Sequence, residues 1–485
     1  MSHREAMSTL DTAWLRMDSG TNRMTIVGVM TCDSRLPYAR LRQLIEERFL
    51  RHARFRDRVV LEGDTPYWER DPWFDLDFHV RRTALPGRGG KRQLHDLVGD
   101  LLTTPLDRER PLWQFHLVER YGKGSAVIAR IHHCYADGIA LMHVLMAITD
   151  DPGAAVPSRR EASSPSMPSP DAADGGGLDW LAPVSRTLDV AWTIGTQITT
   201  ACAHLLRHPE HAADYALKGV DAALEAARLV VMPTDSATRL KAPLAGIKRA
   251  AWSGRFPLRR IKALAHATEC SVNDVLLSAV AGSLRDYLRE KGDGSEGVEI
   301  RALVPVNLRP GEDVESLGNR FGLVALLLPV YMSHPLKRLY EVKRRMQALK
   351  RSTQAYVTLG LLAAVGMSPK SVQDEIVGLL ARRATAVMTN VPGPGQPRSL
   401  GGCRIREIVF WVPQAGNIGL GMSVLSYNGG VQFGVLGDAG VAPDPERIVS
   451  AFPAQLAGLE AAVAAAGAPR RASRSGRAAR ISGSR

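Results

Sequence analysis

The chain has 485 residues, of which 45% are hydrophobic and 23% are charged, proportions that are ordinary for a globular protein with a sizeable core. This length allows two or three domains. The five cysteines are scattered and odd in number, so a disulfide framework is not expected and a reducing cytoplasm suits the chain. The first residues carry acids early and have no long apolar core, which argues against a secretory signal peptide.

The net charge of +13 is unevenly distributed, because the residues from Pro469 onward include six arginines and no acids. This composition predicts a disordered basic tail, either a solvated terminus or a segment attracted to anionic lipid headgroups. No recognition motif supports specific nucleic-acid binding. No run reaches the roughly 20 apolar residues that span a bilayer, so the chain is expected to be soluble or peripheral to a membrane.

The hydrophobic pattern of the first 150 residues predicts both helices and strands. Apolar residues at helical spacing predict helices over 8–20, 38–51 and 94–102, the last ended by Pro105. Residues 24–30 and 113–118 predict strands, and the second is expected to lie beside a further strand over 124–131. A helix is expected from Gly138, where apolar residues again recur at helical spacing.

Two histidines, His132 and His133, lie where this last strand gives way to the helix, and Asp137 and Gly138 follow them. Because side chains alternate along a strand, only one imidazole can point into a given site, and the other supports it or packs. A neutral imidazole is well suited to take a proton from an alcohol near pH 7. Asp137 could orient it or hold the loop, and Gly138 leaves room where a substrate could pass.

The same stretch has other interpretations. It could be a buried histidine pair, with Asp137 capping the helix. A zinc site is less favoured, because neighbouring strand residues point apart and no second histidine or cysteine cluster stands at ligand spacing. Cys134 as a thiol nucleophile is also disfavoured, because the alternation turns it away from His133.

Residues 150–177 are dense in proline, serine, alanine and glycine, which predicts a disordered or loosely tethered segment. Two helices are expected to follow over 180–232, on either side of Pro209. Their apolar stripe, within 190–206, either packs on the body of the protein or lies on a membrane or lipid-droplet surface.

Helices and strands alternate again from about residue 255 onward. Helices are expected over 258–269, 271–289, 336–349, 372–380 and 445–463, and Ser271 with Asp274 predicts a capping box at the start of the second. Strands are expected over 299–306, 323–330, 384–391 and 404–412, and a hairpin joins 419–426 to 431–436 across Asn428. The pattern indicates two α/β lobes with a crevice between them.

The pattern His-His-x-x-x-Asp-Gly resembles the signature of CoA-dependent acyltransferases with the chloramphenicol acetyltransferase-like fold, which nonribosomal-peptide condensation domains share. Further motifs narrow the resemblance to the bacterial wax ester synthase/acyl-CoA:diacylglycerol acyltransferase family and extend it over residues 8–465. They are Leu10-Asp11-x-x-Trp14-Leu15, Pro105-Leu-Asp-x-x-x-Pro111-Leu112-Trp113, Ser271-Val-Asn273-Asp274-Val-Leu-Leu277, Leu317-Gly-Asn-Arg-Phe-Gly322 and Thr389-Asn-Val-Pro-Gly-Pro394.

The resemblance implies an α/β fold of two chloramphenicol acetyltransferase-like lobes, each a mixed β-sheet with packed helices, and an active-site channel between them. It places the amino-terminal lobe in 1–150 and the carboxy-terminal lobe in 251–466. A linker over 151–179, a helical connection over 180–250 and the basic tail over 467–485 complete the expected division.

The resemblance also implies transfer of a long-chain acyl group from acyl-CoA to the hydroxyl of diacylglycerol or of a long-chain fatty alcohol. His133 is then the general base, His132 and Asp137 orient it, and Asn273 positions or stabilises the reacting centre. Acyl-CoA is a co-substrate, and neither a metal nor a prosthetic group is implied. The remaining candidate substrate-binding residues are Gly138, Pro111, Leu112, Trp113 and Asp274.

Some of these residues also have purely structural interpretations. Pro111-Leu112-Trp113 could be a turn followed by a core tryptophan, and Asp274 a helix cap. Tyr135 stands where small or aliphatic residues are common in the family, and it is expected to alter access of the acceptor.

The expected partners are acyl-CoA, the acceptor lipid, and peripherally the inner face of the plasma membrane or lipid droplets, from the cytoplasm. The oligomeric state is left open, with a homodimer as one option. Two alternatives remain: a free-standing condensation-type domain that uses carrier-bound acyl groups, and a lipid-surface binding protein that has lost turnover.

Overall fold

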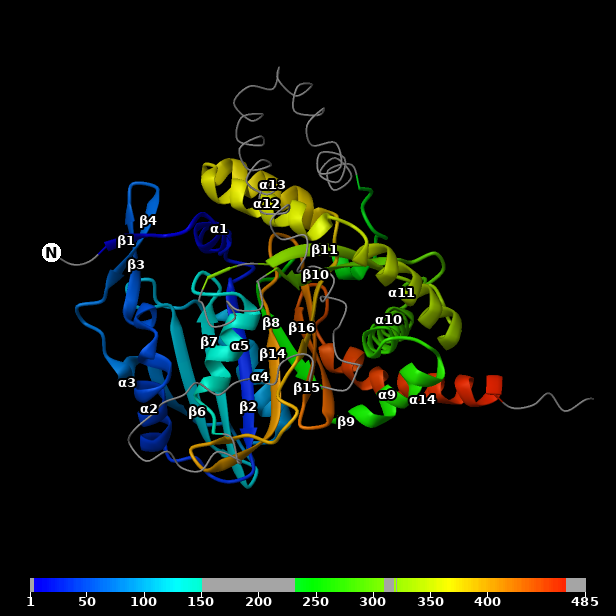
Figure 1. The fold of residues 1–485 in the computed structure, drawn as a ribbon, viewed down its shortest axis with the longest axis horizontal. Helices are drawn as coiled ribbons and strands as arrows, with labels where there is room; N and C mark the ends of the chain where they lie inside the picture. Colours follow the sequence, from blue (N-terminus) through cyan, green and yellow to red (C-terminus); the bar gives the residue numbers. More distant parts are fainter. Residues whose placement is uncertain (1–3, 151–231, 309–317, 320, 468–485) are drawn as a thin grey trace, which may run out of the picture.

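The computed structural model describes residues 4–150, 232–308, 318–319 and 321–467 (Figure 1). The expected linker over 151–179, most of the helical connection over 180–250 and the tail from 468 lie outside the described residues. The described part contains two large β-sheets with helices on their faces, together with a small three-stranded sheet. The predicted α/β class is therefore confirmed.

The first half contains the predicted helices and strands, with their ends shifted by a few residues. Strand β1 was not anticipated, and it pairs antiparallel with β4 in the small sheet. The elements are β1 (Arg4–Ala6), α1 (Thr9–Met17), β2 (Thr25–Cys32), α2 (Tyr38–Glu47), η1 (Phe49–Arg51), η2 (Ala53–Arg56), β3 (Asp57–Glu62), β4 (Thr65–Arg70), α3 (Leu76–His79), β5 (Val80–Thr83), α4 (Lys91–Thr103), β6 (Trp113–Tyr121), β7 (Gly124–His132) and α5 (Gly138–Ala147).

The second half contains the predicted helices and strands in their predicted order, together with an unanticipated helix over Gln354–Met367 and short strands over Phe256–Pro257 and Ser399–Leu400. Its hairpin turns at Asn428 and Gly429, both with positive φ, as a two-residue turn of this hand requires. Its elements are η6 (Arg239–Lys241), β8 (Lys248–Trp252), β9 (Phe256–Pro257), α9 (Leu258–Ala267), α10 (Val272–Glu290), β10 (Ile300–Asn307), β11 (Phe321–Leu328), α11 (Pro335–Lys350), α12 (Gln354–Met367), α13 (Lys370–Arg382), β12 (Ala386–Pro392), β13 (Ser399–Leu400), β14 (Cys403–Trp411), β15 (Leu420–Tyr427), β16 (Gly430–Asp438) and α14 (Pro445–Gly467).

The sheet that leads to the two histidines has the strand order β13-β14-β2-β7-β6-β5. β7 pairs antiparallel with β6, as predicted, and with β2 on its other side. One face of β7, with Val127, Ala129 and Ile131, packs with α5, and the opposite face packs with α4. Because β13 and β14 come from the second half, the histidine sheet contains strands from both halves of the chain.

The second large sheet is mixed and has the order β11-β10-β12-β15-β16-β8, with β9 also paired to β16. Helices α9, α10, α11 and α14 surround its core. Strand β8 corrects the expectation of a helical connection that continues to residue 250. It is a five-residue strand whose partner β16 is far away in sequence, so no local periodicity reveals it.

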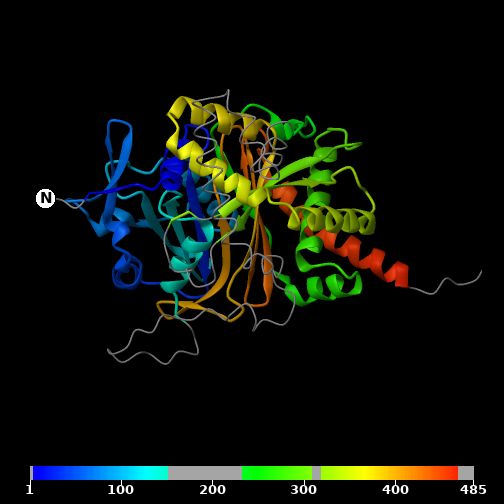
Figure 2. The same cartoon turned by 45° about the horizontal axis from the view of Figure 1, so that its top comes forward.

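Helices α12 and α13 of the second half lie beside α1 of the first half in both views (Figures 1 and 2). Gly366 in α12 packs so closely against the backbone of Thr9 that a side chain larger than hydrogen has no room. Gln373 of α13 donates a hydrogen bond from Nε2 to the carbonyl oxygen of Ala13, at 2.8 Å. The second half therefore fixes the position of α1.

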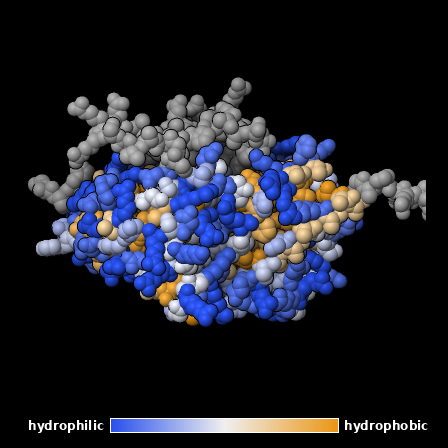
Figure 3. Space-filling view, turned by 90° about the horizontal axis from the view of Figure 1, so that it is seen from below, coloured by the Kyte–Doolittle hydropathy of each residue, from blue (hydrophilic) through white to orange (hydrophobic). Residues whose placement is uncertain are grey.

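Helix α14 is long and apolar enough to cross a membrane, judged by its length of 22 residues and its mean hydropathy of 1.5. The sequence pattern predicts a helix here, but not one that could cross a membrane. In this fold one face, with Ile448, Phe452 and Leu459, is buried in the core around the second sheet. The outward face is rich in alanine, and Figure 3 shows hydrophobic residues gathered at the end of the molecule where α14 lies. Core packing thus accounts for the large apolar residues of this face, whereas 28% of the apolar stretch as a whole is buried.

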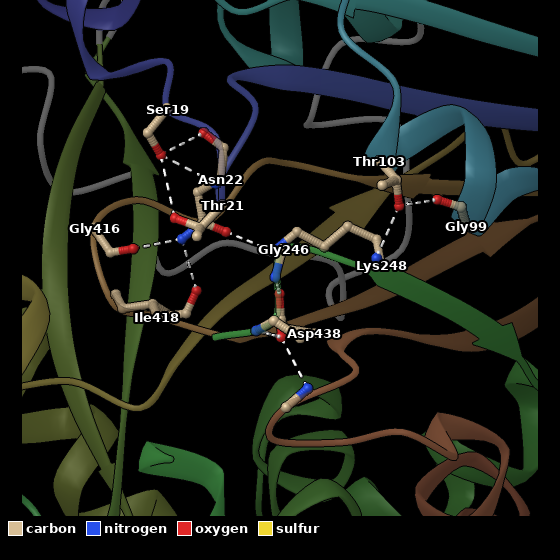
Figure 4. A network of polar contacts seen from close by, with 12 residues as sticks. Ser19, Thr21, Asn22, Gly99, Thr103, Gly246, Lys248, Gly416, Ile418 and Asp438 are labelled. Carbon is tan, nitrogen blue, oxygen red and sulfur yellow. Dashed lines mark hydrogen bonds and ion pairs between the residues drawn. The ribbon is translucent and has the colours of Figure 1, made fainter. Parts of the chain in front are cut away.

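A polar network around the buried ion pair of Lys248 and Asp438 joins the two halves (Figure 4). The Nζ atom of Lys248 in β8 donates to Asn22 Oδ1 at 2.6 Å and lies 3.5 Å from Asp438 Oδ2 in β16. The backbone N–H of Lys248 donates to Thr103 Oγ1 at the end of α4. The amide of Asn22 in turn donates to two carbonyl oxygens of the second half, those of Gly416 and Ile418.

We expect Lys248→Met to lower the free energy of unfolding by about 3 kcal/mol, because it leaves the Asp438 carboxylate buried without its cation. Three backbone N–H groups still donate to that carboxylate, which keeps the loss at the lower end of the usual range. Urea denaturation measures this loss in the free energy of unfolding. The matched control is Lys370→Met, which breaks an exposed pair with Asp374 and should cost less than about 1 kcal/mol. Equal losses would contradict the buried pair's role.

Candidate active site

The two histidines lie at the end of β7, where the chain leaves the sheet. The backbone N–H of His132 donates to the carbonyl oxygen of Leu112 at 2.9 Å, and that of His133 donates to the carbonyl oxygen of Met24 at 2.7 Å. The loop before β6 and the loop before β2 therefore hold the two residues from opposite sides. Both histidines are buried, with 3% and 2% of their surface exposed.

The His132 ring has a local hydrogen bond, since its Nδ1 accepts from the backbone N–H of Cys134 at 3.2 Å. Nδ1 is thus unprotonated, and the neutral ring carries its proton on Nε2. Burial lowers the pKa of His132 to about 4. The ring is therefore a neutral supporting group, as the sequence predicted for one of the two histidines.

The His133 ring lies between aromatic side chains from both halves of the chain. It stacks on Trp14 of α1, with ring centroids 4.1 Å apart and an interplanar angle of 17°, and it lies 5.6 Å from the ring of Phe321 in β11. Burial lowers the pKa of His133 to about 4, while Asp137, the backbone of His133 itself and the side chain of Asn319 act in the opposite direction. The imidazole is therefore neutral near pH 7, the form that can accept a proton.

Asp137 is the N-cap of α5, as one interpretation of the sequence proposed. Its Oδ1 accepts hydrogen bonds from the backbone N–H groups of Ile139 and Ala140, and its charge acts on His133. Gly138 begins the helix where a Cβ atom would lie 2.8 Å from the ring of Phe410 in β14. Close packing against β14 thus accounts for the glycine.

The Pro111-Leu112-Trp113 motif touches the histidines through its backbone. Trp113 is fully buried among aromatic rings, and its Nε1 donates to the carbonyl oxygen of Phe55 at 2.7 Å. Tyr135 is also buried there; its hydroxyl accepts from the N–H of Leu112 and donates to the carbonyl oxygen of Asp57. The bulk of Tyr135 therefore fills the core under this loop, and Trp113 is a core tryptophan.

The Ser271-Val-Asn273-Asp274 motif starts helix α10 with the predicted capping box. Ser271 Oγ accepts from the N–H of Asp274, whose carboxylate accepts from the N–H of Ser271. Asn273 is one position away from this cap and its Oδ1 accepts from Nδ2 of Asn390 in β12, at 2.7 Å. The structure thus joins two motifs that are more than 100 residues apart in the sequence.

Four residues around His133 were quoted in motifs but received no role from the sequence. Trp14 and Phe321 pack on the imidazole, while Asp11 and Asn319 form a hydrogen-bonded pair beside it. The sequence did contain a signal for these four residues, since they belong to the Leu10–Leu15 and Leu317–Gly322 motifs. No cluster of three or more histidine, cysteine, aspartate or glutamate residues suited to a metal ion occurs among the described residues.

The fold resembles solved acyl-transferring domains. The wax ester synthase/diacylglycerol acyltransferase from Marinobacter aquaeolei VT8 superposes with a TM-score of 0.65 at 22% identity, covering 95% of this chain and 99% of that one. The first condensation domain of the CDA synthetase gives a TM-score of 0.55 at 16% identity, covering 94% and 96%. These likenesses place the chain in the class of proteins with a condensation-domain-like fold.

Sequence comparison identifies the family within this class. The family model for the wax ester synthase/diacylglycerol acyltransferase catalytic domain matches residues 7–276, and that for the WS/DGAT C-terminal domain matches 317–460. Two probable diacylglycerol O-acyltransferases of Mycobacterium tuberculosis are 31% and 30% identical, covering 85% and 82% of this chain and 84% of each relative. The chain belongs to the wax ester synthase/diacylglycerol acyltransferase family and is an acyltransferase.

We expect Tyr135→Phe to destabilise the fold by about 1–3 kcal/mol, because the ring still packs while two backbone groups lose their hydroxyl partner. Thermal or urea unfolding monitored by circular dichroism measures the change. Tyr340, which is 48% exposed, supplies the control, and Tyr340→Phe should change stability by less than about 0.5 kcal/mol. A Tyr135→Phe protein as stable as wild type would show that the loop is held by other contacts.

Proposed function

We propose that this acyltransferase moves a long-chain acyl group from acyl-CoA to the hydroxyl of diacylglycerol or of a long-chain fatty alcohol, with His133 as general base. The observation that carries the proposal is the neutral imidazole of His133, buried between Trp14 of the first half and Phe321 of the second. Such a ring can take a proton at neutral pH and is shielded from bulk water, which limits competing hydrolysis of the thioester.

The reaction needs no covalent enzyme intermediate, because the thioester is already activated. As the hydroxyl oxygen attacks the thioester carbonyl carbon, its proton passes to Nε2 of His133. The tetrahedral intermediate then collapses, the carbon–sulfur bond breaks, and the imidazolium returns the proton to the departing CoA thiolate. General-base help of this kind contributes about 10²–10⁴-fold. Acyl-CoA and acceptor reach the ring from opposite ends of a channel between the lobes.

The other motif residues support this step. Asp137 holds the start of α5 behind the histidine and favours the imidazolium electrostatically, while His132 packs beside it as a neutral ring. Asn273 is proposed to stabilise the oxyanion. Its Oδ1 is engaged by Asn390, so its Nδ2 group remains to donate toward developing negative charge.

The acceptor lipids are insoluble in water, so we propose that the enzyme works peripherally at the cytoplasmic face of the membrane or on lipid droplets. Its net charge of +13 suits an anionic lipid surface. Acyl-CoA serves as co-substrate, and the proposed steps use no bound cofactor.

Replacing the base tests the proposal directly. Purified protein with palmitoyl-CoA should release thiol only when dioleoylglycerol or hexadecanol is present, and His133→Ala should lower that rate by about 10²–10⁴-fold. Offering the two acceptors separately ranks them. The control is His143→Ala, because His143 lies in helix α5 but outside the histidine motif. This variant should keep wild-type activity.

If wild type and His133→Ala release thiol at the same rate, His133 is not the base. If neither turns over free acyl-CoA but wild type accepts an acyl group presented on a phosphopantetheinylated carrier, the condensation-type alternative is correct. Absence of turnover with every donor would favour a lipid-surface binding role.

The pKa of His133 predicts an unusual pH profile. Because burial holds this pKa near 4, the ring stays neutral through the weakly acidic range, and kcat/KM should remain flat from pH 8 to about pH 5. A free histidine base, with a pKa of about 6.5, would instead lose rate below that pH. Stopped assays across this range measure the profile.

The same shift affects stability, so folding must be monitored at each pH. The pKa of the ring is about 6.5 in the unfolded chain and about 4 in the folded protein, so the unfolded state binds more protons between these values. Stability is therefore greatest above about pH 6.5 and falls as the pH is lowered toward 4. A drop in kcat/KM near pH 6.5 in fully folded protein would contradict a buried base.

A further inference from the structure

Asn319 lies beside the histidine motif without a role in the steps described above. It is 4% exposed and follows Gly318, whose backbone pairs with the motif loop: the N–H of Gly318 donates to the carbonyl oxygen of Tyr135, and the N–H of Asp137 donates to that of Gly318. This short pairing brings the Leu317–Gly322 motif of the second half against the loop that follows His133. Asn319 is thereby fixed next to the candidate base.

The orientation of the Asn319 amide is determined by its neighbours. Its Nδ2 donates to Asp11 Oδ1 at 2.8 Å and to the carbonyl oxygen of His133 at 2.9 Å. Both partners can only accept when Asp11 is ionised, so the nitrogen must face them and the Oδ1 oxygen must lie on the other side. Helix α1 supplies Asp11 and is itself held by α12 and α13, so the amide is anchored from both halves.

Within the described part of the chain, two buried polar atoms near each other lack a hydrogen-bond partner, and one could donate to the other. Oδ1 of Asn319 and Nδ1 of His133 are both buried and have no hydrogen-bond partner within the ranges that the structure describes. One is an acceptor, and the other is a donor in one neutral tautomer and in the imidazolium. After Asp137 and the backbone of His133 itself, the side chain of Asn319 also acts to raise the pKa of His133, so the amide lies within electrostatic reach of the ring. Two unpaired buried polar atoms side by side are costly unless they pair during function.

We propose that Asn319 is a positioning residue whose Oδ1 accepts from Nδ1–H of His133, so that Nε2 is the nitrogen that faces the substrate hydroxyl. The inference rests on His133 being the general base. The two atoms are not hydrogen-bonded in this structure, and the bond forms when the ring becomes an imidazolium, since hydrogen bonds of catalytic groups commonly tighten during the reaction. Asp11 fixes the amide from behind, and the stacked indole of Trp14 prevents the imidazole from tilting.

The arrangement does for His133 what a carboxylate does in a serine-protease triad, but with a neutral acceptor. A neutral amide orients the ring and selects its tautomer without holding it protonated, which suits a base that must be neutral before each turnover. The charged and titratable groups that face the ring are Asp137 from the start of α5, Asp11 through Asn319, and the neighbouring His132. None of them occupies the Nδ1 side directly within the described contacts.

Asn319→Ala tests the inference. We expect kcat to fall by about 10- to 100-fold, because a base that is free to rotate loses its alignment, while KM for palmitoyl-CoA stays within about threefold. The assay is acceptor-dependent thiol release with dioleoylglycerol, run beside wild type and His133→Ala. Should Asn319→Ala fail to fold, Asn319→Ser keeps a small polar group there and should show the same fall in kcat.

Asn22→Ala is the matched control, since Asn22 is also a buried asparagine whose Nδ2 donates to two carbonyl oxygens, and its side chain has no described hydrogen bond to His133 or Asn319. It should lose thermal stability but keep the wild-type kcat per folded molecule. A merely structural Asn319 would behave in the same way, so equal kcat values for folded Asn319→Ala and wild type would overturn the inference.

Asn319→Asp adds a readout that a structural role would not move. A carboxylate facing Nδ1 should raise the pKa of His133 and shift the acidic limb of kcat/KM upward by about one pH unit or more. An unshifted limb would also overturn the inference. The proposed function is judged separately. If His133→Ala keeps wild-type activity, both the general base and the role of Asn319 are wrong. If His133→Ala is inactive while Asn319→Ala keeps wild-type activity, only the role of Asn319 is wrong.

Discussion

Pairing of β14 with β2 is the constraint on which the candidate site depends. β14 belongs to the second half of the chain, yet it lies in the sheet that carries the histidines, one strand away from β7. Its Phe410 occupies the space next to Gly138, so the start of α5 is shaped by a residue some 270 positions away. The histidine motif therefore reaches its geometry only after both halves have come together, which is a slow kind of contact to form.

The same dependence recurs around the imidazole of His133. Its stacking partner Trp14 sits on α1, which the second half fixes through Gly366 and Gln373. Phe321 comes directly from the second half. The ring is consequently dry, neutral and restrained at the boundary between the halves, and these three properties are what proton transfer from an alcohol requires. The hydrogen bonds from Lys248 to Asn22 and Thr103 hold the same boundary at another point.

Much of this could be predicted from local sequence. Periodicity located most helices and strands, Ser271 with Asp274 indicated a cap, and the strand–histidine–helix order placed His132 and His133 between β7 and α5. The resemblance of several short motifs to those of a known family was enough to name the family. Strand β8 was missed because five residues show no usable period. Helix α14 was missed as a possible span because Glu446, Arg447 and Glu460 interrupt its apolar residues.

By itself, the sequence determined the fold class, the family and the identity of the candidate base, because these depend on patterns within short segments. The tertiary structure alone decided the surroundings of that base: Trp14 above the ring, Asn319 beside it, and Tyr135 turned into the core. Asp137 was ambiguous in the sequence between orienting the histidine and capping the helix, and the structure shows the cap. Burial and the direction of a side chain arise from contacts between distant segments, so no local pattern contains them.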